Sequence, residues 1–351
     1  MALSAVSAES WLEPLDRVRS AIFARALRVA SLRAVLVAKG RRVPALLLLH
    51  AGVALVLAVL APTLLLVVGP LVLGVPHLFS DVRYLVLRPE LPKAARRWLL
   101  GGAGLMLALR VAELAGFPAS LRFELPVAAL WVAGSAALGA NRWRDARLLV
   151  VAGLAGAFFW AGWLAPNAVR LVMAHVHNPI ALCIWALVFS PTRSRVRGVL
   201  LAVGAATVML LVTPLAWLGF QHGAVQSFGL HSFAAAEKLA PFVSSVPLAL
   251  GVVSSFAFLQ SVHYAVWLHA IPQEATRGEG TLTFRMSFRG ARAELGRLGL
   301  GIAALIVILV PAFGLFAPLR THAVYLSLAT FHGYLELGAL ALWWLRREAS
   351  Q

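Results

Sequence analysis

Residues 44–60 read PALLLLHAGVALVLAVL, and residues 63–86 read TLLLVVGPLVLGVPHLFSDVRYLV. In these two runs the only fully charged side chains are those of Asp81 and Arg83. Each run is close in length to the roughly 20 apolar residues with which an α-helix crosses a bilayer. The two runs therefore predict a pair of transmembrane helices, separated by a short break at Pro62.

The rest of the chain has the same character. Of its 351 residues, 61% are hydrophobic and 13% are charged, and the mean hydropathy is +0.84. These values lie far outside the range of a soluble globular domain. We therefore expect an all-α, polytopic helical bundle of about ten transmembrane helices, in the bacterial inner (cytoplasmic) membrane. The ten predicted spans are residues 44–60, 63–86, 98–115, 125–140, 148–165, 168–190, 198–220, 243–271, 298–317 and 323–345.

Lys and Arg residues concentrate in alternate connections between these spans, while the intervening connections carry almost none. Because cytoplasmic loops of membrane proteins are enriched in Lys and Arg, ten spans place both termini in the cytoplasm. The formal charge of +17 therefore reflects topology, and no basic stretch has the interleaved aromatic residues of a nucleic-acid groove. The basic connections are residues 39–42, 93–97, 142–147, 193–197, 277–297 and 346–347.

Residues 1–42 mix apolar side chains such as Trp11 with several arginines. This pattern predicts a cytoplasmic amphipathic segment that lies on the membrane surface, with a solvated tail as the alternative. Residues 43–351 are expected to form a single transmembrane domain, because the longest polar connection, residues 272–297, is too short for a separate soluble domain.

The chain contains one cysteine, Cys183. It can form neither an intramolecular disulfide nor a cysteine-based zinc or iron–sulfur site. Any metal would therefore be held by histidines and carboxylates. Ionisable groups inside transmembrane spans are costly, so each one is a candidate functional residue.

Histidines occur in the second, sixth, eighth and tenth predicted spans, which all run in the same direction across the membrane. Two of these spans place a carboxylate four residues after a histidine, on the same helical face: Asp81 after His77, and Glu336 after His332. We expect these imidazoles to meet near the middle of the membrane and to bind a metal ion. The candidate ligands are His77, His175, His177, His263, His269 and His332.

Helix geometry limits which histidines can share one ion. His175 and His177 point about 200° apart, so one of them is expected to face the site. His269 lies about 240° around a regular helix from His263, so both can bind only where the helix is distorted.

Neutral imidazoles suit Fe, Cu or Zn, and the carboxylates can either ligate the ion or orient a histidine. An open coordination position in a dry, apolar cavity suits O2 chemistry on a lipophilic substrate. Tyr264 lies within a turn of the histidines, where it can serve as core packing or as a wall around a long apolar ligand. The candidate catalytic residues are Asp81, Glu336 and Tyr264.

The ordered boxes Gly74-Val-Pro-His77-x-x-x-Asp81, His175-Val-His177, Val-His263 and His332-x-x-x-Glu336 resemble those of the Brp/Blh family of membrane β-carotene 15,15′-dioxygenases. The resemblance covers about forty residues in short boxes. It implies a non-haem iron held by histidines and O2-dependent cleavage of a carotenoid double bond.

By this resemblance His77, His175 or His177, and His263 would be ligands. The chain departs from the family's Pro-His-Gly box by placing Leu78 after the histidine. It departs from the His-Ser-x-x-His box because the second histidine, His269, comes two residues late. The fourth ligand is therefore either His269 or His332.

The leading hypothesis is a membrane metalloenzyme that uses Fe(2+), with Cu or Zn as alternatives, and O2 to oxidise a lipophilic substrate such as a carotenoid or similar polyene. One alternative is a haem b electron-transfer protein, in which two of the histidines are axial ligands. A second is a proton-coupled transporter that uses the intramembrane histidines and carboxylates as a relay.

Overall fold

The computed structural model describes residues 10–117, 120–140, 145–190, 193–226 and 230–346, and these residues form helices without any β-strand. All ten predicted spans fall on helical segments. The helices before the site region are η1 (Ser10–Leu12), α1 (Glu13–Ala26), α2 (Ala30–Leu36), α3 (Lys39–Leu60) and α4 (Pro62–Val68). The middle of the chain forms η2 (Gly69–Gly74), α5 (Val75–Val82), η3 (Arg83–Leu87), α6 (Lys93–Leu114), α7 (Ser120–Gly139), α8 (Ala146–Leu164), α9 (Pro166–Ile184) and η4 (Trp185–Phe189). The remaining helices are α10 (Arg193–Val212), α11 (Leu215–Gln221), α12 (Ser232–Leu239), α13 (Val246–Ala265), η5 (Val266–Ala270), α14 (Ile271–Glu274), α15 (Phe284–Phe316), α16 (Pro318–Ala329) and α17 (Phe331–Arg346).

Seven helical segments of the described chain are long and apolar enough to cross a membrane. The prediction of an integral membrane, all-helical protein is thereby confirmed, with lipid as its surroundings. The other three predicted spans correspond to α6, to α7 and to α16 with α17. The seven segments are Lys39–Leu60, Pro62–Leu87, Ala146–Leu164, Pro166–Phe189, Arg195–Val212, Val246–Glu274 and Phe284–Phe316.

Three pairs of consecutive helices are joined by a single non-helical alanine that precedes a proline. Ala61, Ala165 and Ala317 each end one helix and cap the next, with φ between −150° and −140° and ψ between 56° and 68°. Proline disfavours helical geometry in the residue before it and is well suited to the first turn of the following helix. Each Ala-Pro pair therefore ends one helix and begins the next without an intervening loop.

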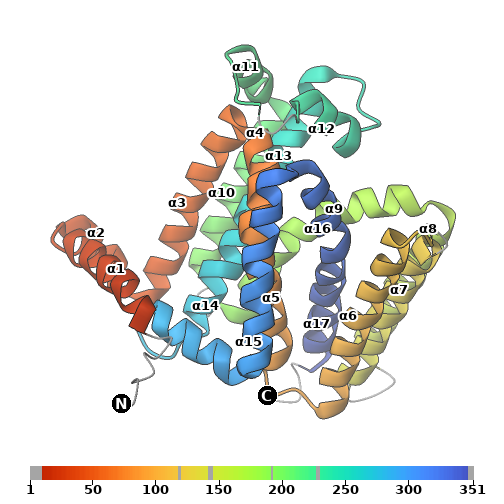
Figure 1. The fold of residues 1–351 in the computed structure, drawn as a ribbon, viewed down its shortest axis with the longest axis horizontal. Coiled ribbons are helices and arrows are strands. Elements are labelled where there is room, and N and C mark those ends of the chain that lie inside the picture. The colour runs from red at the N-terminus through yellow and green to blue at the C-terminus, as the bar shows by residue number, and fades with distance from the viewer. Residues whose placement is uncertain (1–9, 118–119, 141–144, 191–192, 227–229, 347–351) are drawn as a thin grey trace, which may run out of the picture.

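The segment Val246–Glu274, which contains α13, lies at the centre of the bundle. It is 67% buried, whereas the α8 and α15 segments are only 11% buried and lie at the periphery. Figure 1 shows α6, α7 and α8 grouped on one side of the molecule, and α9 crossing from the end of α8 toward the centre. There α9 contacts both α13 and α17.

Each of the three segments that contain α5, α9 and α13 includes at least one π-helical turn: η2 and η3 flank α5, η4 follows α9, and η5 follows α13. Such turns change the direction in which the following side chains point, and they are frequent at functional sites.

The amphipathic N-terminal helix α1 is attached to the beginning of α15 through Asp16. The Asp16 carboxylate is 5% exposed and accepts hydrogen bonds from the backbone N–H groups of Phe284 (2.8 Å) and Arg285 (3.2 Å). Burial opposes ionisation of Asp16, but these hydrogen bonds and the Arg285 guanidinium outweigh it and keep its pKa below the ordinary value. The docking of α1 therefore depends on the ionised carboxylate.

Candidate metal centre

Four histidines from four helices meet in the interior of the bundle. They are His77 on α5, His177 on α9, His263 on α13 and His332 on α17, and we call them the histidine cluster. Their ring centroids lie 4.9 Å apart for His77 and His332, 5.2 Å for His77 and His263, and 5.0 Å from His177 to each of His263 and His332. The convergence predicted from sequence is thus present for one histidine per helix.

Three members of the histidine cluster have the spacing of a metal site. One ring nitrogen of each of His77, His263 and His332 lies within 4.8 Å of the other two. Two nitrogens that share an ion at about 2.1 Å are at most about 4.2 Å apart. Three nitrogens arranged around one ion at that distance are about 3.4–3.6 Å apart, so the three rings need to approach one another by up to about 1.4 Å to bind it.

The nitrogens of these rings lack ordinary partners. His263 is fully buried, His77 is 1% exposed and His332 is 8% exposed. Neither nitrogen of His77 or His263, nor Nε2 of His332, makes a hydrogen bond with the described part of the chain. Buried polar atoms are rarely left unsatisfied, and a bound ion is one of the few explanations for such a group. The donor set therefore fits a metal ion.

The tautomer of two rings follows from their backbone contacts. His332 donates its Nδ1 proton to the carbonyl of Ala329, and His177 donates its Nδ1 proton to the carbonyl of Ala174 at 3.2 Å. A carbonyl oxygen only accepts, so the Nε2 atoms of both rings carry the free lone pair. This arrangement is the usual one for metal-binding histidines.

One turn beyond the histidine cluster lies a second set of polar side chains. Asp81, Trp267 and Glu336 each follow a cluster histidine by four residues, and we call them the carboxylate layer. Trp267 donates its indole N–H to Oε1 of Glu336 at 2.7 Å, and the same oxygen lies 3.8 Å from Nε2 of His263. Ser80 fixes the Trp267 backbone by donating its hydroxyl proton to the Trp267 carbonyl at 2.6 Å.

Both carboxylates of this layer are fully buried. Asp81 has no hydrogen-bond partner at either oxygen, and Glu336 has none at Oε2, within the described residues. The two groups interact electrostatically with each other. Ionised carboxylates are very costly to bury without compensation, so these two groups are either protonated or balanced by a nearby positive charge.

Two tyrosines pack against the helical segment that carries Gly74 and His77. The Tyr264 ring centroid lies 4.7 Å from that of His77, and Tyr325 lies directly on the backbone of Gly74. A Cβ atom at Gly74 would lie 2.9 Å from Cε1 of Tyr325 and still closer to its Cζ and Oη. The glycine in the box Gly74-Val-Pro-His77 is therefore required by the tyrosine from a distant helix.

Two predicted ligands lie outside the histidine cluster. The ring of His175 packs on Phe256, and its Nε2–H donates to the carbonyl of Leu239 at 2.9 Å. His269 is on η5, and its electrostatic neighbours are His50 and Arg42. Between the alternatives that the sequence left open, the structure brings His177 and His332 to the site, and not His175 or His269.

Sequence reasoning missed a buried ionic group, which we call the Glu124 cluster: Arg110, Glu124, Arg170 and Tyr334. Glu124 is 1% exposed and accepts hydrogen bonds from Arg110 at 2.9 Å, Arg170 at 2.8 Å and the Tyr334 hydroxyl at 3.0 Å. Charges within or beside predicted spans are themselves a signal of such a group, so Arg110, Glu124 and Arg170 could have been singled out.

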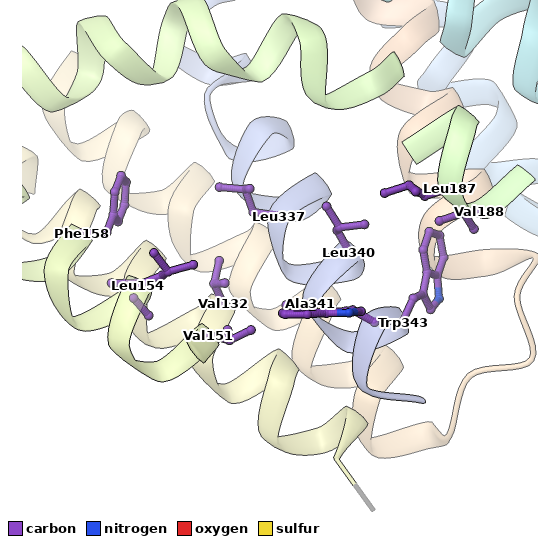
Figure 2. Close-up of a pocket in the computed structure, with 13 residues that line it drawn as sticks. Val132, Val151, Leu154, Phe158, Leu187, Val188, Leu337, Leu340, Ala341 and Trp343 are labelled. Atoms are coloured by element: carbon purple, nitrogen blue, oxygen red, sulfur yellow. The ribbon is translucent and has the colours of Figure 1, made fainter. Parts of the chain in front are cut away.

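An apolar pocket of about 500 Å³ lies beside the helices that carry the site (Figure 2). Its walls come from α7, α8, η4 and α17. Leu337 of this pocket directly follows Glu336, and Leu187 belongs to the π-helical turn that continues α9. Its size is typical of small-molecule sites, and its lining suits a hydrocarbon.

In comparisons with known protein families, curated proteins and solved structures, nothing matches this chain.

Proposed function

We propose that this protein is a membrane-embedded, non-haem iron oxygenase that acts on a lipophilic substrate such as a carotenoid or similar polyene. The observation that carries the proposal is the convergence of His77, His263 and His332, whose buried nitrogens lie within 4.8 Å of one another. His177 completes a four-histidine set. Fe(2+) is the proposed ion, and Cu or Zn would fit the same nitrogen ligands.

Charge balance supports a divalent ion. Four neutral imidazoles contribute no charge, while Asp81 and Glu336 provide up to two negative charges close to the same point, with no Lys or Arg bonded to them among the described residues. A divalent cation would compensate both carboxylates. When iron is bound, it supplies the redox chemistry by which O2 oxidises an unsaturated, lipid-soluble molecule.

The protein's own residues have separable roles in this proposal. The four histidines would hold the ion, and burial of the His77, His263 and His332 rings would exclude water from it. The Trp267 N–H holds Oε1 of Glu336 near His263. Glu336 and Asp81 are the two candidates to hold a proton near the site. Tyr264 forms a wall against His77. The apolar pocket of Figure 2 offers space for a hydrocarbon chain.

The topology proposed with this function has ten spans, both termini in the cytoplasm and the bacterial inner membrane as its location. In Figure 1, α1 and the end of α17 lie at the same end of the molecule, opposite the short helices α11 and α12. This arrangement is what an even number of crossings requires.

Haem b is a less suitable occupant. A porphyrin needs an open slot between two axial imidazoles, whereas His77 and His332 contact each other and His177 contacts both His263 and His332. A visible spectrum of the purified protein separates the two ideas, because haem gives a strong Soret band.

Metal analysis of protein purified without chelators tests the proposal. We expect about one equivalent of a divalent transition metal per chain, and a loss of most of it in His77→Ala. His175→Ala is the matched control, because His175 lies outside the cluster on the same helix as His177, and it should keep its metal. Less than about one tenth of an equivalent in the unaltered protein, also after incubation with Fe(2+), would reject the proposal.

A further inference from the structure

The Glu124 cluster joins several helices at one buried point. Arg110 lies on α6, Glu124 on α7, Arg170 on α9 and Tyr334 on α17. Arg110 also donates its Nε–H to the carbonyl of Ser327 on α16 at 3.1 Å. One carboxylate therefore fixes five helices relative to one another.

The hydrogen bonds within the Glu124 cluster have well-defined geometry. Oε2 of Glu124 accepts from both guanidinium groups, and Oε1 accepts from the Tyr334 hydroxyl. Charge-assisted hydrogen bonds of this kind are shorter and stronger than neutral ones. In a low-dielectric interior, removal of one partner leaves an uncompensated polar group, so the cluster resists rearrangement.

Two helices of the Glu124 cluster also carry members of the histidine cluster. Arg170 precedes His177 on α9 by seven residues, which is two turns on the same helical face. Tyr334 follows His332 on α17 by two residues. The rings of His177 and His332 have centroids 5.0 Å apart, so the two helices meet at the site as well as at Glu124.

The backbones of α9 and α17 are in close contact at this level. A Cβ atom at Gly333, between His332 and Tyr334, would lie 3.4 Å from Cβ of His177. The two helices are therefore packed against each other beside His177 and His332. A displacement of Tyr334 would therefore be transmitted directly to the separation of His177 and His332.

We propose that Glu124 is a positioning residue for the metal centre: through Arg170 and Tyr334 it fixes α9 relative to α17 and so sets the coordination geometry at His177 and His332. The inference rests on the proposed metal-binding function and deepens it. It assigns a role to an ionic group that touches neither the ion nor its ligands.

Cobalt(II) substitution tests this role, because the visible absorption of Co(2+) reports its ligand geometry directly. Tyr334→Phe is the most informative variant, since it removes one oxygen and leaves Glu124 paired with both arginines. We expect shifted Co(2+) absorption bands and about tenfold weaker Co(2+) affinity. Glu124→Gln should change the spectrum further.

Glu113→Gln is the matched control. Glu113 pairs with Arg110 at 2.8 Å on the outer side of the Glu124 cluster, and no bond links it to Arg170 or Tyr334 in the described structure. It should keep the wild-type Co(2+) spectrum and affinity. Folding of each variant is checked by size-exclusion chromatography and tryptophan fluorescence.

A folded Tyr334→Phe protein with the wild-type spectrum and affinity would overturn the positioning role and leave the metal proposal intact, whether or not Glu124→Gln folds. A change of the same size in Glu113→Gln would also overturn it, by showing a general effect of lost ion pairs. Failure of the unaltered protein to bind Co(2+) would overturn both proposals.

Discussion

Gly74→Ala should destabilise the protein by overpacking, although alanine is the better helix former. The added Cβ would lie 2.9 Å from Cε1 of Tyr325 and closer to Cζ and Oη. The Tyr325 ring is 6% exposed and packs against Val75 and Ala329, so it has no free space to move into. Forcing an extra methyl group into such a core costs about 1–3 kcal/mol.

Gly52→Ala on α3 provides the reference, because no described atom outside its own helix backbone lies within 4 Å of the added Cβ. That variant should gain roughly 0.5–1 kcal/mol from reduced backbone entropy. The two variants should therefore differ by about 2 kcal/mol or more, which is roughly a 30-fold change in the ratio of folded to unfolded protein.

Reversible unfolding in mixed micelles measures this difference. Replacing Tyr325 with Leu in the Gly74→Ala background should restore part of the loss, and a double-mutant cycle gives the coupling between the two positions. Equal stability of Gly74→Ala and Gly52→Ala, or no coupling to Tyr325, would refute the close packing of Tyr325 on Gly74.

Three further variants probe other parts of the structure. Trp267→Phe removes the indole N–H that donates to Glu336; it should cost about 1–3 kcal/mol in thermal unfolding, and an unchanged midpoint would contradict the role of this bond. Acidification should release α1 from the beginning of α15. The pKa of Asp16 is lowered in the folded state. The contribution of Asp16 to the stability of this contact is therefore complete above the unfolded pKa of about 3.9 and is lost as the pH falls through the folded pKa. Hydrogen exchange of α1 against pH measures this, and Asp16→Asn should show fast exchange at every pH. Ala155→Trp should fill part of the apolar pocket and lower the affinity for a polyene without loss of metal, whereas unchanged polyene binding would place the substrate elsewhere.

The membrane character of the fold was predictable because it depends on local composition. A continuous apolar run such as residues 44–60 satisfies its backbone groups internally as a helix, whereas a barrel strand would alternate apolar and polar residues. The position of each break was also predictable where a proline lies between two runs, as at Pro62. The path of α9 across the bundle was not predictable. Its direction is set by packing against α13 and α17, and the sequence of α9 alone does not specify it.

The candidate site was predictable to the level of which helices take part. Spacing of four residues linked His77 to Asp81 and His332 to Glu336, and both pairs lie at the site. The choice between His269 and His332 was not predictable, since it depends on how four helices pack. The charges of Glu124 and its arginine partners are visible in the sequence, but their pairing with Tyr334 is not, because Glu124 and Tyr334 are 210 residues apart.

The single-alanine joints between consecutive helices have a consequence for biosynthesis. Ala61 belongs to the ends of both α3 and α4, so no stretch of polar chain separates the two hydrophobic segments as they leave the ribosome. The two segments therefore emerge one directly after the other, and we expect each such pair to insert as a helical hairpin. The same expectation holds at Ala165 and Ala317.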